Sequence, residues 1–475
     1  MAEKSLWTAQ ELVAATGGTL HGDVRGPMNG VSIDSRAVQA GDVFVAIKGE
    51  KLDGHDFVIG ALKSGAGVAV VSRVTDEMKA AGAVLHVADD PLRGLENMGR
   101  AARAWSRGQI IAVTGSVGKT STKEMLRFAL SASGETHASA ASFNNHWGVP
   151  LTLARLSRSA AFGVFEIGMN HSGEITPLVK MVQPHVAIVT AVAASHLGHF
   201  KSVDEIADAK AEIFSGVVAG GAAVINQDSA YFEKLKVIAA SRGIKNIIGF
   251  GKSINAAVRL ERVALHQNCC CITADVMGEK VTYKLGVPGE HMALNSLAVL
   301  AAVKLTGADL ARAAMALADA APAKGRGVQE RLHLDGGELL LIDESYNANP
   351  ASMKAALGLL SHAHVGKNGR RVAVLGDMLE LGDFGPALHA EIADVLDDYK
   401  VDVVYAAGPL MRNLWEATPA AKRGTYVQTS AELKDILISE LQGGDVVMVK
   451  GSLGSRMGIL VDAMRTKFAP ITKES

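Results

Sequence analysis

Residues 112–122, Ala-Val-Thr-Gly-Ser-Val-Gly-Lys-Thr-Ser-Thr, constrain the fold of this chain more than any other stretch. A short β-branched run, Ile110 to Val113, precedes the glycines, and the residues after them are typical of a helix. A strand, a glycine-rich loop and a helix in this order form a cradle where backbone N–H groups converge on an anion. The pattern therefore predicts a loop that binds the phosphates of a nucleoside triphosphate.

The side chains of this loop suit the same ligand. Lys119 supplies a mobile positive charge, and Thr120 offers a hydroxyl to a magnesium ion. The first glycine lies only three positions before Gly118, so the loop is shorter than the common form. The alternative is a glycine-rich turn with an incidental lysine, although strand, glycines, Lys-Thr pair and helix all fall in register. The expected phosphate-binding residues are Thr114, Gly115, Ser116, Val117, Gly118, Lys119, Thr120 and Ser121.

The length of 475 residues allows about three domains. Strand and helix signals alternate after residue 107, which predicts a largely parallel, doubly wound sheet. A flexible Pro/Gly-bearing segment at 320–327 marks a second boundary. We expect an α/β protein with a small mixed N-terminal domain (1–106), a central P-loop domain (107–322) and a C-terminal Rossmann-like domain (323–475).

Particular elements follow from the same patterns. Apolar, β-branched runs predict central strands at 162–167, 186–190 and 222–226, and alternating residues at 256–285 predict appended antiparallel strands. In the C-terminal domain we expect strands at 339–342, 371–375, 401–406 and 445–449, with helices at 351–361, 386–399 and 431–441.

Charge and apolar content exclude some classes of protein. A net charge of −1 argues against a nucleic-acid-binding protein. Because no apolar run approaches the ~18 residues needed to span a bilayer and the N-terminus lacks a signal-peptide core, we expect a cytosolic protein without membrane insertion. The three adjacent cysteines, 269–271, have neither disulfide nor metal-ligand spacing, and we interpret them as small residues alternating between the faces of a strand.

Polar residues follow two of the central strands. Glu166 closes one apolar run and His196 comes shortly after another. Ligands of open parallel sheets gather at the carboxyl ends of strands, so both are candidate metal ligands. The alternatives are a strained edge carboxylate for Glu166, which burial makes costly, and a capping or packing histidine for His196.

Lys210 lies in a predicted helix, 203–214, near the centre of its apolar stripe. A snorkelling stem is the alternative, but that suits the edge of a stripe better than its middle. A desolvated lysine is pushed toward its neutral, chemically useful form.

Other polar clusters leave two interpretations open. Asn144 and Asn145 precede a Gly-Val-Pro sequence, and paired asparagines either bind a substrate or supply turn chemistry. The N-terminal segments around Ser35-Arg36 and Asp53-Gly54-His55 present hydrogen-bond donors for an anionic or uracil-like ligand, or are solvated turns.

The sequence resembles the ATP-dependent Mur ligases of bacterial cell-wall synthesis over essentially its whole length. The resemblance is carried by the 114–120 loop, Glu166 in Glu-Ile-Gly-Met, His196 in Ser-His-Leu, Lys210 in Ala-Lys-Ala-Glu-Ile, Asn295, Gly325-Arg326, Asp343 to Pro350, Leu375 to Gly382 and Lys450-Gly451-Ser452. Asn144-Asn145 and Asp-Glu-Ser-Tyr-Asn-Ala-Asn-Pro resemble the members that add D-alanyl-D-alanine to UDP-N-acetylmuramoyl-tripeptide.

The resemblance implies phosphorylation of the tripeptide carboxylate by ATP, followed by attack of the dipeptide amine and release of ADP and phosphate. It implies Lys119, Lys210, His196 and Glu166 as catalytic residues, with two magnesium sites held by Thr120 and Glu166 and by His196 and a carbamylated Lys210. Asn295, Arg326 and Asp343 are implied nucleotide contacts. The implied substrate contacts are Ser35, Arg36, Asp53, Gly54 and His55 for the UDP-sugar, with Asn144, Asn145, Tyr346, Asn347, Asn349 and Ser452.

Other functions stay open at this point. One is a relative that adds a diamino acid, or a folylpolyglutamate-type ligase. The other is a P-loop switch that binds a nucleotide to control a partner, although a switch does not need two further domains with polar strand ends. We expect the protein to act as a monomer.

Overall fold

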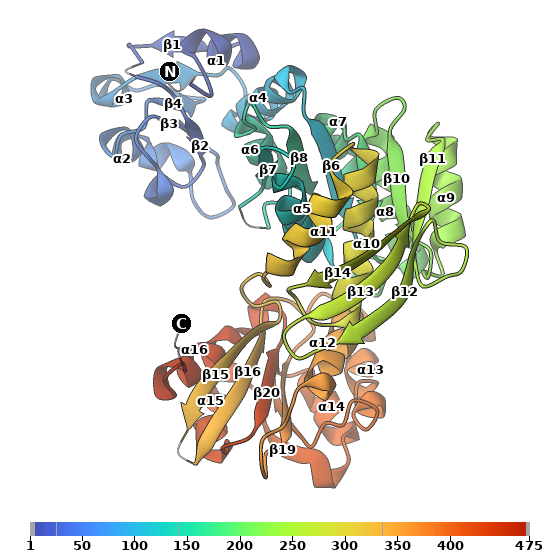
Figure 1. Cartoon of the computed structure of the whole chain (residues 1–475). Helices are drawn as coiled ribbons and strands as arrows, with labels where there is room; N and C mark the ends of the chain where they lie inside the picture. Colours follow the sequence, from blue (N-terminus) through green and yellow to red (C-terminus); the bar gives the residue numbers. More distant parts are fainter. Residues whose placement is uncertain (1–4, 25, 141, 335, 472–475) are drawn as a thin grey trace.

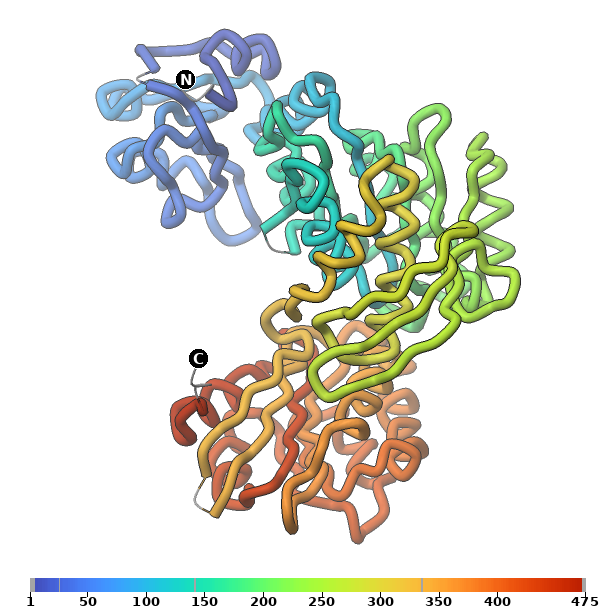
Figure 2. The backbone as a smooth tube through the Cα atoms, viewed as in Figure 1, coloured from blue at the N-terminus to red at the C-terminus, as the bar shows by residue number. Residues whose placement is uncertain are grey.

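The computed structural model of the chain describes residues 5–24, 26–140, 142–334 and 336–471. It shows three α/β domains, each built on its own sheet (Figure 1). The N-terminal domain, in blue, and the C-terminal domain, in orange to red, both adjoin the central domain and lie apart from one another (Figure 2). Among the described residues, no helix combines the length and apolar character required to cross a membrane.

The N-terminal domain has a mixed five-stranded sheet in the order β1-β5-β4-β3-β2, with only β1 antiparallel to its neighbour. The strands β3 and β4 are buried throughout, and apolar except for Asp42, because helices cover both faces of the sheet. The elements are α1 (Ala9–Thr16), β1 (Thr19–His21), β2 (Gly30–Ser32), β3 (Asp42–Val45), α2 (Val58–Lys63), β4 (Val68–Val71), α3 (Asp76–Ala81), β5 (Val84–His86) and α4 (Pro91–Trp105).

The central sheet has nine strands in the order β14-β13-β12-β11-β10-β9-β6-β8-β7. The strands from β7 to β12 in this order are parallel, which confirms the doubly wound prediction. The strand β6 lies between β8 and β9, so the connections from β6 and from β9 run to opposite sides of the sheet. Such a reversal of direction leaves a crevice at the carboxyl ends of the two strands, β6 and β9. The strands of this parallel part are β6 (Gln109–Thr114), β7 (Thr136–Ala138), β8 (Phe162–Glu166), β9 (Val186–Val189), β10 (Ala222–Asn226) and β11 (Asn246–Gly251).

The predicted antiparallel strands form an arm that extends toward the C-terminal domain (Figure 1). The arm consists of β12 (Val258–Leu265), β13 (Cys270–Val276) and β14 (Glu279–Leu285). Cys270 is buried and Cys271 exposed, as alternation along a strand predicts. The helices of the central domain are α5 (Lys119–Ser131), α6 (Gly148–Ala154), α7 (Ile175–Val182), α8 (Val203–Ala211), α9 (Phe232–Ser241), α10 (Glu290–Leu305) and α11 (Leu310–Ala316).

The C-terminal sheet has six strands in the order β15-β16-β20-β17-β18-β19, and only β15 and β16 pair antiparallel. The predicted strands and the helices at 351–361 and 431–441 are confirmed within a few residues at each end. The elements are β15 (Val328–Leu334), β16 (Gly337–Glu344), α12 (Pro350–His362), β17 (Arg371–Gly376), α13 (Gly385–Ala390), β18 (Val403–Ala407), α14 (Met411–Ala417), β19 (Arg423–Val427), α15 (Ser430–Glu440), β20 (Val446–Lys450) and α16 (Gly458–Lys467).

Two predicted helices end early. The helix predicted at 386–399 ends at Ala390, and a 3-10 turn, Ala393–Val395, follows it. The backbone N–H groups of Ile392 and Leu396 bond three residues back, so the chain tightens there instead of continuing as an α-helix. The helix predicted at 203–214 likewise passes into a 3-10 helix, Glu212–Gly216, after Ala211.

We call the contact between the N-terminal and central domains the N-terminal junction. The helix α6 adds Leu151 and Ala154 to the N-terminal core, and the Trp7 indole N–H donates to the Ala154 carbonyl at 2.8 Å. The buried Arg103 of α4 donates to the Val182 and Gln183 carbonyls at 2.7 and 2.8 Å. Shared apolar core and buried hydrogen bonds hold these two domains as one packed unit.

We call the contact between the central and C-terminal domains the C-terminal junction. The Gly198 N–H donates to the Glu380 carbonyl at 2.9 Å, and the Gln329 amide donates to the Gln267 carbonyl at 3.1 Å. Leu388 is only partly buried and packs against the central core. This junction rests largely on polar contacts between loops.

Candidate active site

The phosphate-binding loop has the predicted strand–loop–helix form, between β6 and α5. Gly118 has φ +87°, and a Cβ there would lie 2.6 Å from the side-chain amide of Asn295. Glycine is therefore required, because any side chain would collide with α10. This close approach also brings the predicted nucleotide contact Asn295 against the loop.

The Lys119 amine sits inside the loop and donates to the Gly115 carbonyl at 2.6 Å. Burial lowers its pKa, the charge of Glu166 opposes that shift, and Arg326 adds to it. Arg326 lies beyond the second predicted boundary, so positive side chains from both sides of the C-terminal junction face the same space.

A second loop, after β9, is tied to the phosphate loop. The Ser116 N–H donates to the Ala191 carbonyl at 2.7 Å, and the Thr190 hydroxyl donates to the Val117 carbonyl at 2.6 Å. A Cβ on Gly115 would lie 2.0 Å from the Thr190 hydroxyl oxygen, so the two loops fit closely. Sequence reasoning missed Thr190, whose only signal was its position at the end of an apolar strand.

Glu166 lies at the end of β8 and is 1% exposed. Its Oε1 accepts a hydrogen bond of 2.7 Å from the Asn144 side-chain amide, whereas Oε2 has no hydrogen-bond partner among the described residues. An orphaned carboxylate oxygen in a buried site is costly unless a ligand satisfies it. Asn144 thus orients Glu166, while the Asn145 side chain accepts from the Trp147 and Gly148 N–H groups and shapes the start of α6.

His196 follows the loop after β9, whose residues hydrogen-bond to the phosphate-binding loop. Its backbone is left-handed, with φ 57°, and its Nδ1 lies 2.5 Å from Oε2 of Glu380, a C-terminal residue. This contact with the imidazole holds the pKa of the Glu380 carboxyl below its usual range. Sequence reasoning did not single out Glu380, although it lies in the recognised Leu375 to Gly382 segment.

Lys210 is buried on α8, as its place in the apolar stripe predicts. Its amine lies 3.8 Å from the Met169 sulfur. Burial, with a smaller contribution from Lys119, lowers the pKa of Lys210 well below its ordinary value. The neutral amine that the sequence predicts is therefore physically reasonable here.

The residues present fit a magnesium ion. The orphaned Glu166 oxygen lies in the same cavity as the Thr120 hydroxyl, and magnesium prefers one or two carboxylates completed by phosphate oxygens and water. No cluster of three or more His, Cys, Asp or Glu side chains suited to a metal occurs in the described part of the chain. The donor set is thus too sparse for a dedicated protein cage and suits a metal that arrives with a nucleotide.

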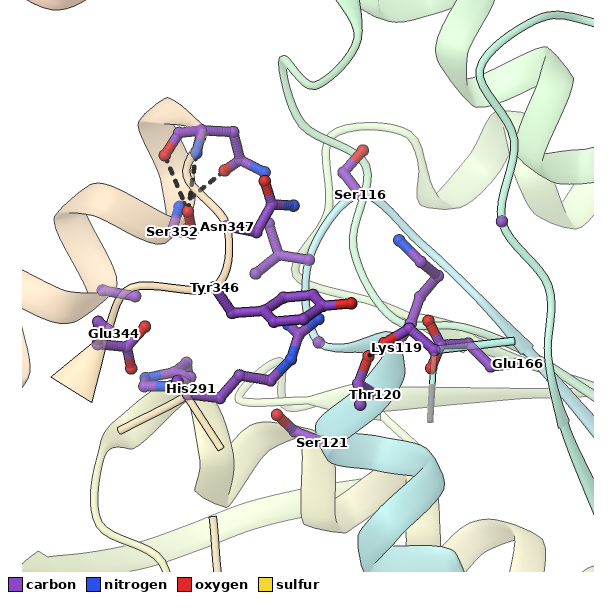
Figure 3. Close-up of a pocket in the computed structure, with 18 of the residues that line it drawn as sticks. Ser116, Lys119, Thr120, Ser121, Glu166, His291, Glu344, Tyr346, Asn347 and Ser352 are labelled. Atoms are coloured by element: carbon purple, nitrogen blue, oxygen red, sulfur yellow. Dashed lines mark hydrogen bonds between the residues drawn. The ribbon is translucent and has the colours of Figure 1, made fainter. Parts of the chain in front are cut away.

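The C-terminal domain contributes the loop after β16. The Arg326 guanidinium lies over the Tyr346 ring, 4.4 Å from its centroid, and the ring extends toward Lys119 (Figure 3). Asp343 is buried, accepts from the Ser345 N–H and hydroxyl, and lies 3.4 Å from the Arg465 guanidinium. Arg465 was not predicted, because α16 lies more than a hundred residues away in sequence.

Two of the predicted dipeptide contacts, Asn349 and Ser452, also form bonds within the C-terminal domain, and their contact with the dipeptide stays a prediction. Asn349 and Ser352 make a capping box at the start of α12 (Figure 3), and the Ser452 hydroxyl accepts from the Leu379 N–H at 2.9 Å. Lys450, which was not predicted, is buried and donates to Glu344 at 3.1 Å and to the Asn347 carbonyl at 2.9 Å. This bond fixes the backbone of the loop that carries Asn347.

These groups surround one cavity of about 250 Å³ at the C-terminal junction. It brings together the predicted residues Ser116 to Ser121, Asn144, Glu166, His196, Arg326, Tyr346, Asn347 and Asn349, and adds His291, Glu344 and Lys450. The predicted residues Thr114, Gly115, Asn145, Lys210, Asn295, Asp343 and Ser452 lie outside its lining.

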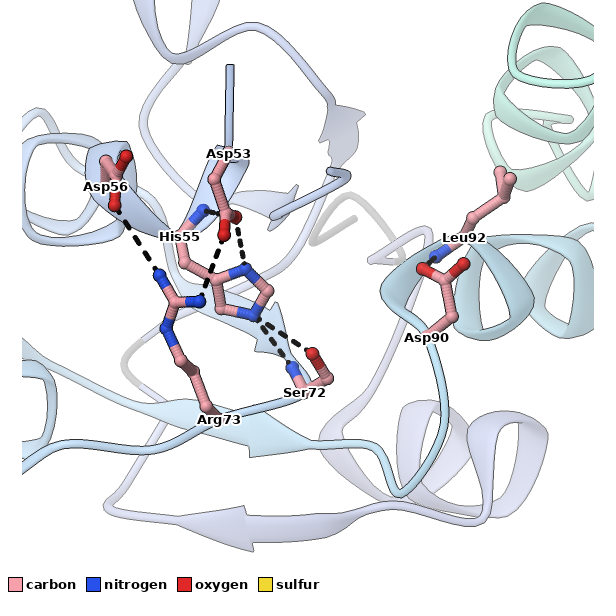
Figure 4. Close-up of polar contacts among 7 residues, drawn as sticks. All are labelled: Asp53, His55, Asp56, Ser72, Arg73, Asp90 and Leu92. Carbon is pink, nitrogen blue, oxygen red and sulfur yellow. Dashed lines mark hydrogen bonds and ion pairs between the residues drawn. The ribbon is translucent and has the colours of Figure 1, made fainter. Parts of the chain in front are cut away.

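Two of the N-terminal substrate candidates, Asp53 and His55, lie in a separate cluster of polar contacts with Asp56, Ser72 and Arg73 (Figure 4). His55 is buried, contacts Asp53 through Nδ1 at 2.7 Å and accepts from the Ser72 N–H through Nε2 at 3.0 Å. Bonds led by the His55 N–H lower the pKa of Asp53 to about 2. Both His55 nitrogens are used within the domain, which favours a role in shaping the loop. Arg36 is exposed and pairs with Asp34, and the predicted substrate contacts of Ser35, Arg36, Asp53, Gly54 and His55 stay predictions.

Fold and site together define an α/β protein of three domains whose phosphate-binding loop faces a second α/β domain across a shared cavity. Its sequence matches the Mur ligase family catalytic domain at residues 27–104, the Mur ligase middle domain at 113–303 and the Mur ligase glutamate ligase domain at 329–453. The chain belongs to the Mur ligase family.

Relatives resemble it along almost its entire length. The UDP-N-acetylmuramoyl-tripeptide–D-alanyl-D-alanine ligase of Escherichia coli is 33% identical over 94% of this chain and 96% of its own, and that of Rickettsia prowazekii is 30% identical over 96% and 99%. A crystal structure of MurF from Acinetobacter baumannii superposes with a TM-score of 0.84 at 33% identity, covering 97% of this chain and 99% of that one. MurF ligase from Thermotoga maritima, solved in complex with ADP, gives 0.76 at 25% identity, covering 93% and 98%.

Proposed function

We propose that this enzyme joins D-alanyl-D-alanine to UDP-N-acetylmuramoyl-tripeptide at the expense of ATP, releasing ADP and phosphate, as one step of peptidoglycan precursor synthesis. The observation that carries the proposal is the full-length similarity to ligases named for this reaction, combined with one cavity that holds the phosphate-binding loop and Glu166 opposite the Tyr346 loop. Because ATP and UDP-linked precursors are cytoplasmic, we place the reaction in the cytoplasm.

The reaction proceeds in two transfers. The tripeptide carboxylate attacks the γ-phosphorus of ATP, ADP leaves, and an acyl phosphate forms; the dipeptide amine then attacks the acyl carbon and phosphate leaves. Lys119 offsets the negative charge that develops during the first transfer, and Arg326, held over Tyr346, contributes a second positive charge. Closure of the cavity by the C-terminal domain excludes water, which would otherwise hydrolyse the acyl phosphate.

Magnesium, when bound, screens the phosphate oxygens and polarises the transferring phosphoryl group. Thr120 and Glu166 are the residues we assign to one ion, because the Glu166 Oε2 is orphaned and Asn144 holds the other oxygen. We assign His196 and a carbamylated Lys210 to a second ion. The support for carbamylation is the buried, neutral character of the Lys210 amine, since only a neutral amine adds carbon dioxide.

The test is substrate-dependent ADP release by the purified protein. We expect release only when ATP, the UDP-linked tripeptide and D-alanyl-D-alanine are all present, because the site is complete only with the acceptor and both domains in place. A diamino acid with the UDP-linked dipeptide tests the sibling activity, and glutamate with a folate tests the folylpolyglutamate-type activity. Hydrolysis of ATP alone at the full rate supports the nucleotide-switch alternative and contradicts the proposal.

A further inference from the structure

Two loops meet at the C-terminal junction beside the cavity. The Leu197–His199 turn follows His196 on the central domain, and the Gly382–Phe384 turn follows Glu380 on the C-terminal domain. Glu380 makes two contacts across the junction: its carbonyl accepts from the Gly198 N–H at 2.9 Å, and its Oε2 lies 2.5 Å from His196 Nδ1. One C-terminal residue thus contacts both the backbone and the imidazole of the loop that lines the site.

The backbone of both loops is shaped for this contact. His196 and Glu380 are left-handed, with φ 57° and 64°, a conformation that costs a residue with a side chain about 1–2 kcal/mol. A Cβ on Gly198 would lie 3.1 Å from the Gly382 nitrogen, and a Cβ on Gly382 would lie 2.8 Å from the Gly198 Cα. Such unfavourable conformations persist where the surrounding structure fixes them. Here each loop is fixed in part by its contact with the opposite domain.

We infer that Glu380 is a positioning residue for the ligase reaction: it fixes the His196 imidazole in its working orientation only while the C-terminal domain is docked. A carboxylate 2.5 Å from Nδ1 attracts that edge of the imidazole and so fixes the orientation of the ring. Docking of the C-terminal domain and completion of the central half of the site are therefore one event. This inference rests on the proposed function.

A purely structural role for the pair predicts a different result. The Glu380 side chain is 48% exposed, and ion pairs at such positions contribute about 1 kcal/mol or less to stability. Its removal should leave the folded chain intact. An effect on turnover without an effect on stability therefore separates positioning from structural support.

The first experiment replaces Glu380 with Gln, which keeps the size and the backbone contact but removes the charge. We expect kcat to fall about 10- to 100-fold, as for other groups that orient a functional histidine, with the melting temperature and the KM for the UDP-linked tripeptide unchanged. The matched control is Asp383→Asn, which removes the same charge from an exposed residue of the same loop. Wild-type kcat in Glu380→Gln, or an equal loss in Asp383→Asn, overturns the inference.

The second experiment disturbs the loop contact without touching the charge. Gly198→Ala inserts a methyl group 3.1 Å from the Gly382 nitrogen, and Gly198 lacks a left-handed φ that would strain its own backbone. We expect kcat to fall, and small-angle X-ray scattering of the ligand-free chain to show a larger radius of gyration. Because both changes act through one contact, adding Glu380→Gln should cost little more. Independent, multiplying losses contradict the inference. Should Glu380→Gln fail to fold, Gly198→Ala alone decides it, and wild-type kcat in that variant contradicts the inference.

The two hypotheses fail in different ways. A wild-type enzyme that does not release ADP with both substrates contradicts the proposed function. An active wild-type enzyme whose Glu380→Gln variant matches it contradicts only the positioning role of Glu380.

Discussion

The two junctions of this chain are built on different principles. At the N-terminal junction, Trp7 and Arg103 bond buried carbonyls, and α6 lends apolar side chains to the neighbouring core. At the C-terminal junction, loops meet through polar contacts such as those of Gly198 and Gln267. Buried apolar area makes a contact rigid, whereas a few solvent-accessible hydrogen bonds open and close at low cost. The cavity lies at the junction that is held by fewer buried apolar contacts.

The largest loss of activity should come from a substitution in the central domain, on its side of the C-terminal junction. Lys119→Ala removes a charge that acts on the transferring phosphoryl group, and we expect kcat/KM to fall by about 10³-fold or more. The measurement is ADP release with both substrates present. Lys236→Ala on α9, whose amine is only loosely paired on the surface, is the control and should retain activity. A modest loss in Lys119→Ala would remove the basis for placing the phosphoryl transfer at this loop.

Trp7→Ala should lower the stability of the chain by weakening the N-terminal junction. Removing a buried Trp, here 1% exposed, costs about 3–5 kcal/mol of stability. Urea unfolding of Trp7→Ala should therefore show that loss, while kcat below the transition stays near the wild-type value. Trp415→Ala, in the C-terminal domain, is the matched change at a partly exposed site and should cost less. Equal losses in the two variants would show that burying Trp7 at the N-terminal junction adds no more stability than a partly exposed Trp does.

Lys210→Arg tests the second magnesium site, which we assign to His196 and a carbamylated Lys210. Arg keeps the positive charge and cannot be carbamylated, so we expect kcat to fall about 10²-fold, as severely as in Lys210→Ala. Short carboxylic acids should partly restore Lys210→Ala by supplying the missing oxygens. Full activity in the Arg variant, or an unmodified Lys210 in a well-resolved metal-bound crystal structure, contradicts the carbamylation proposal.

Asn347→Ala tests the C-terminal side of the cavity. The loss of one substrate hydrogen bond, about 0.5–1.5 kcal/mol, should raise the KM for the dipeptide by about 3- to 10-fold and leave kcat nearly unchanged. Lys450 fixes this loop through the Asn347 carbonyl, so the substitution should not displace the backbone. The KM for ATP serves as the internal control, and a change confined to ATP would show that the loop does not bind the dipeptide.

The smallest effect should be a pH dependence of stability near both junctions. Burial lowers the pKa of His389, which accepts from the Met378 N–H, and lowers that of His185, beside Arg103. A folded-state pKa below the unfolded value of about 6.5 means that the unfolded chain takes up protons first. The stabilisation is therefore complete above that value and lost as the pH falls through the folded pKa.

Thermal unfolding at pH 7.5 and 5.5 measures this effect. The wild-type melting temperature should drop on acidification, and His389→Gln, which keeps an acceptor for the Met378 N–H, should drop less. The same loss in both proteins would show that other groups control the acid sensitivity of the C-terminal domain.

Local sequence determined the parts of this protein that depend on near neighbours. The order of strand, glycines, lysine and helix in residues 110–128 was enough to define the phosphate-binding loop, and helical periodicity was enough to bury Lys210. Apolar runs located most strands because alternating burial is set by a residue's own segment. Resemblance to the family then supplied the reaction, which periodicity does not encode.

The tertiary structure alone decided which polar groups meet. Asn144 orients Glu166, Glu380 contacts His196, and Lys450 fixes the Asn347 loop, each across a long separation in sequence. A pattern of hydrophobicity states whether a side chain is buried but not which distant group satisfies its hydrogen bonds. Those partners are set by strand order and domain docking, which is why the bonds that Asn349 and Ser452 make within the C-terminal domain were not foreseen, while their contact with substrate stays a prediction.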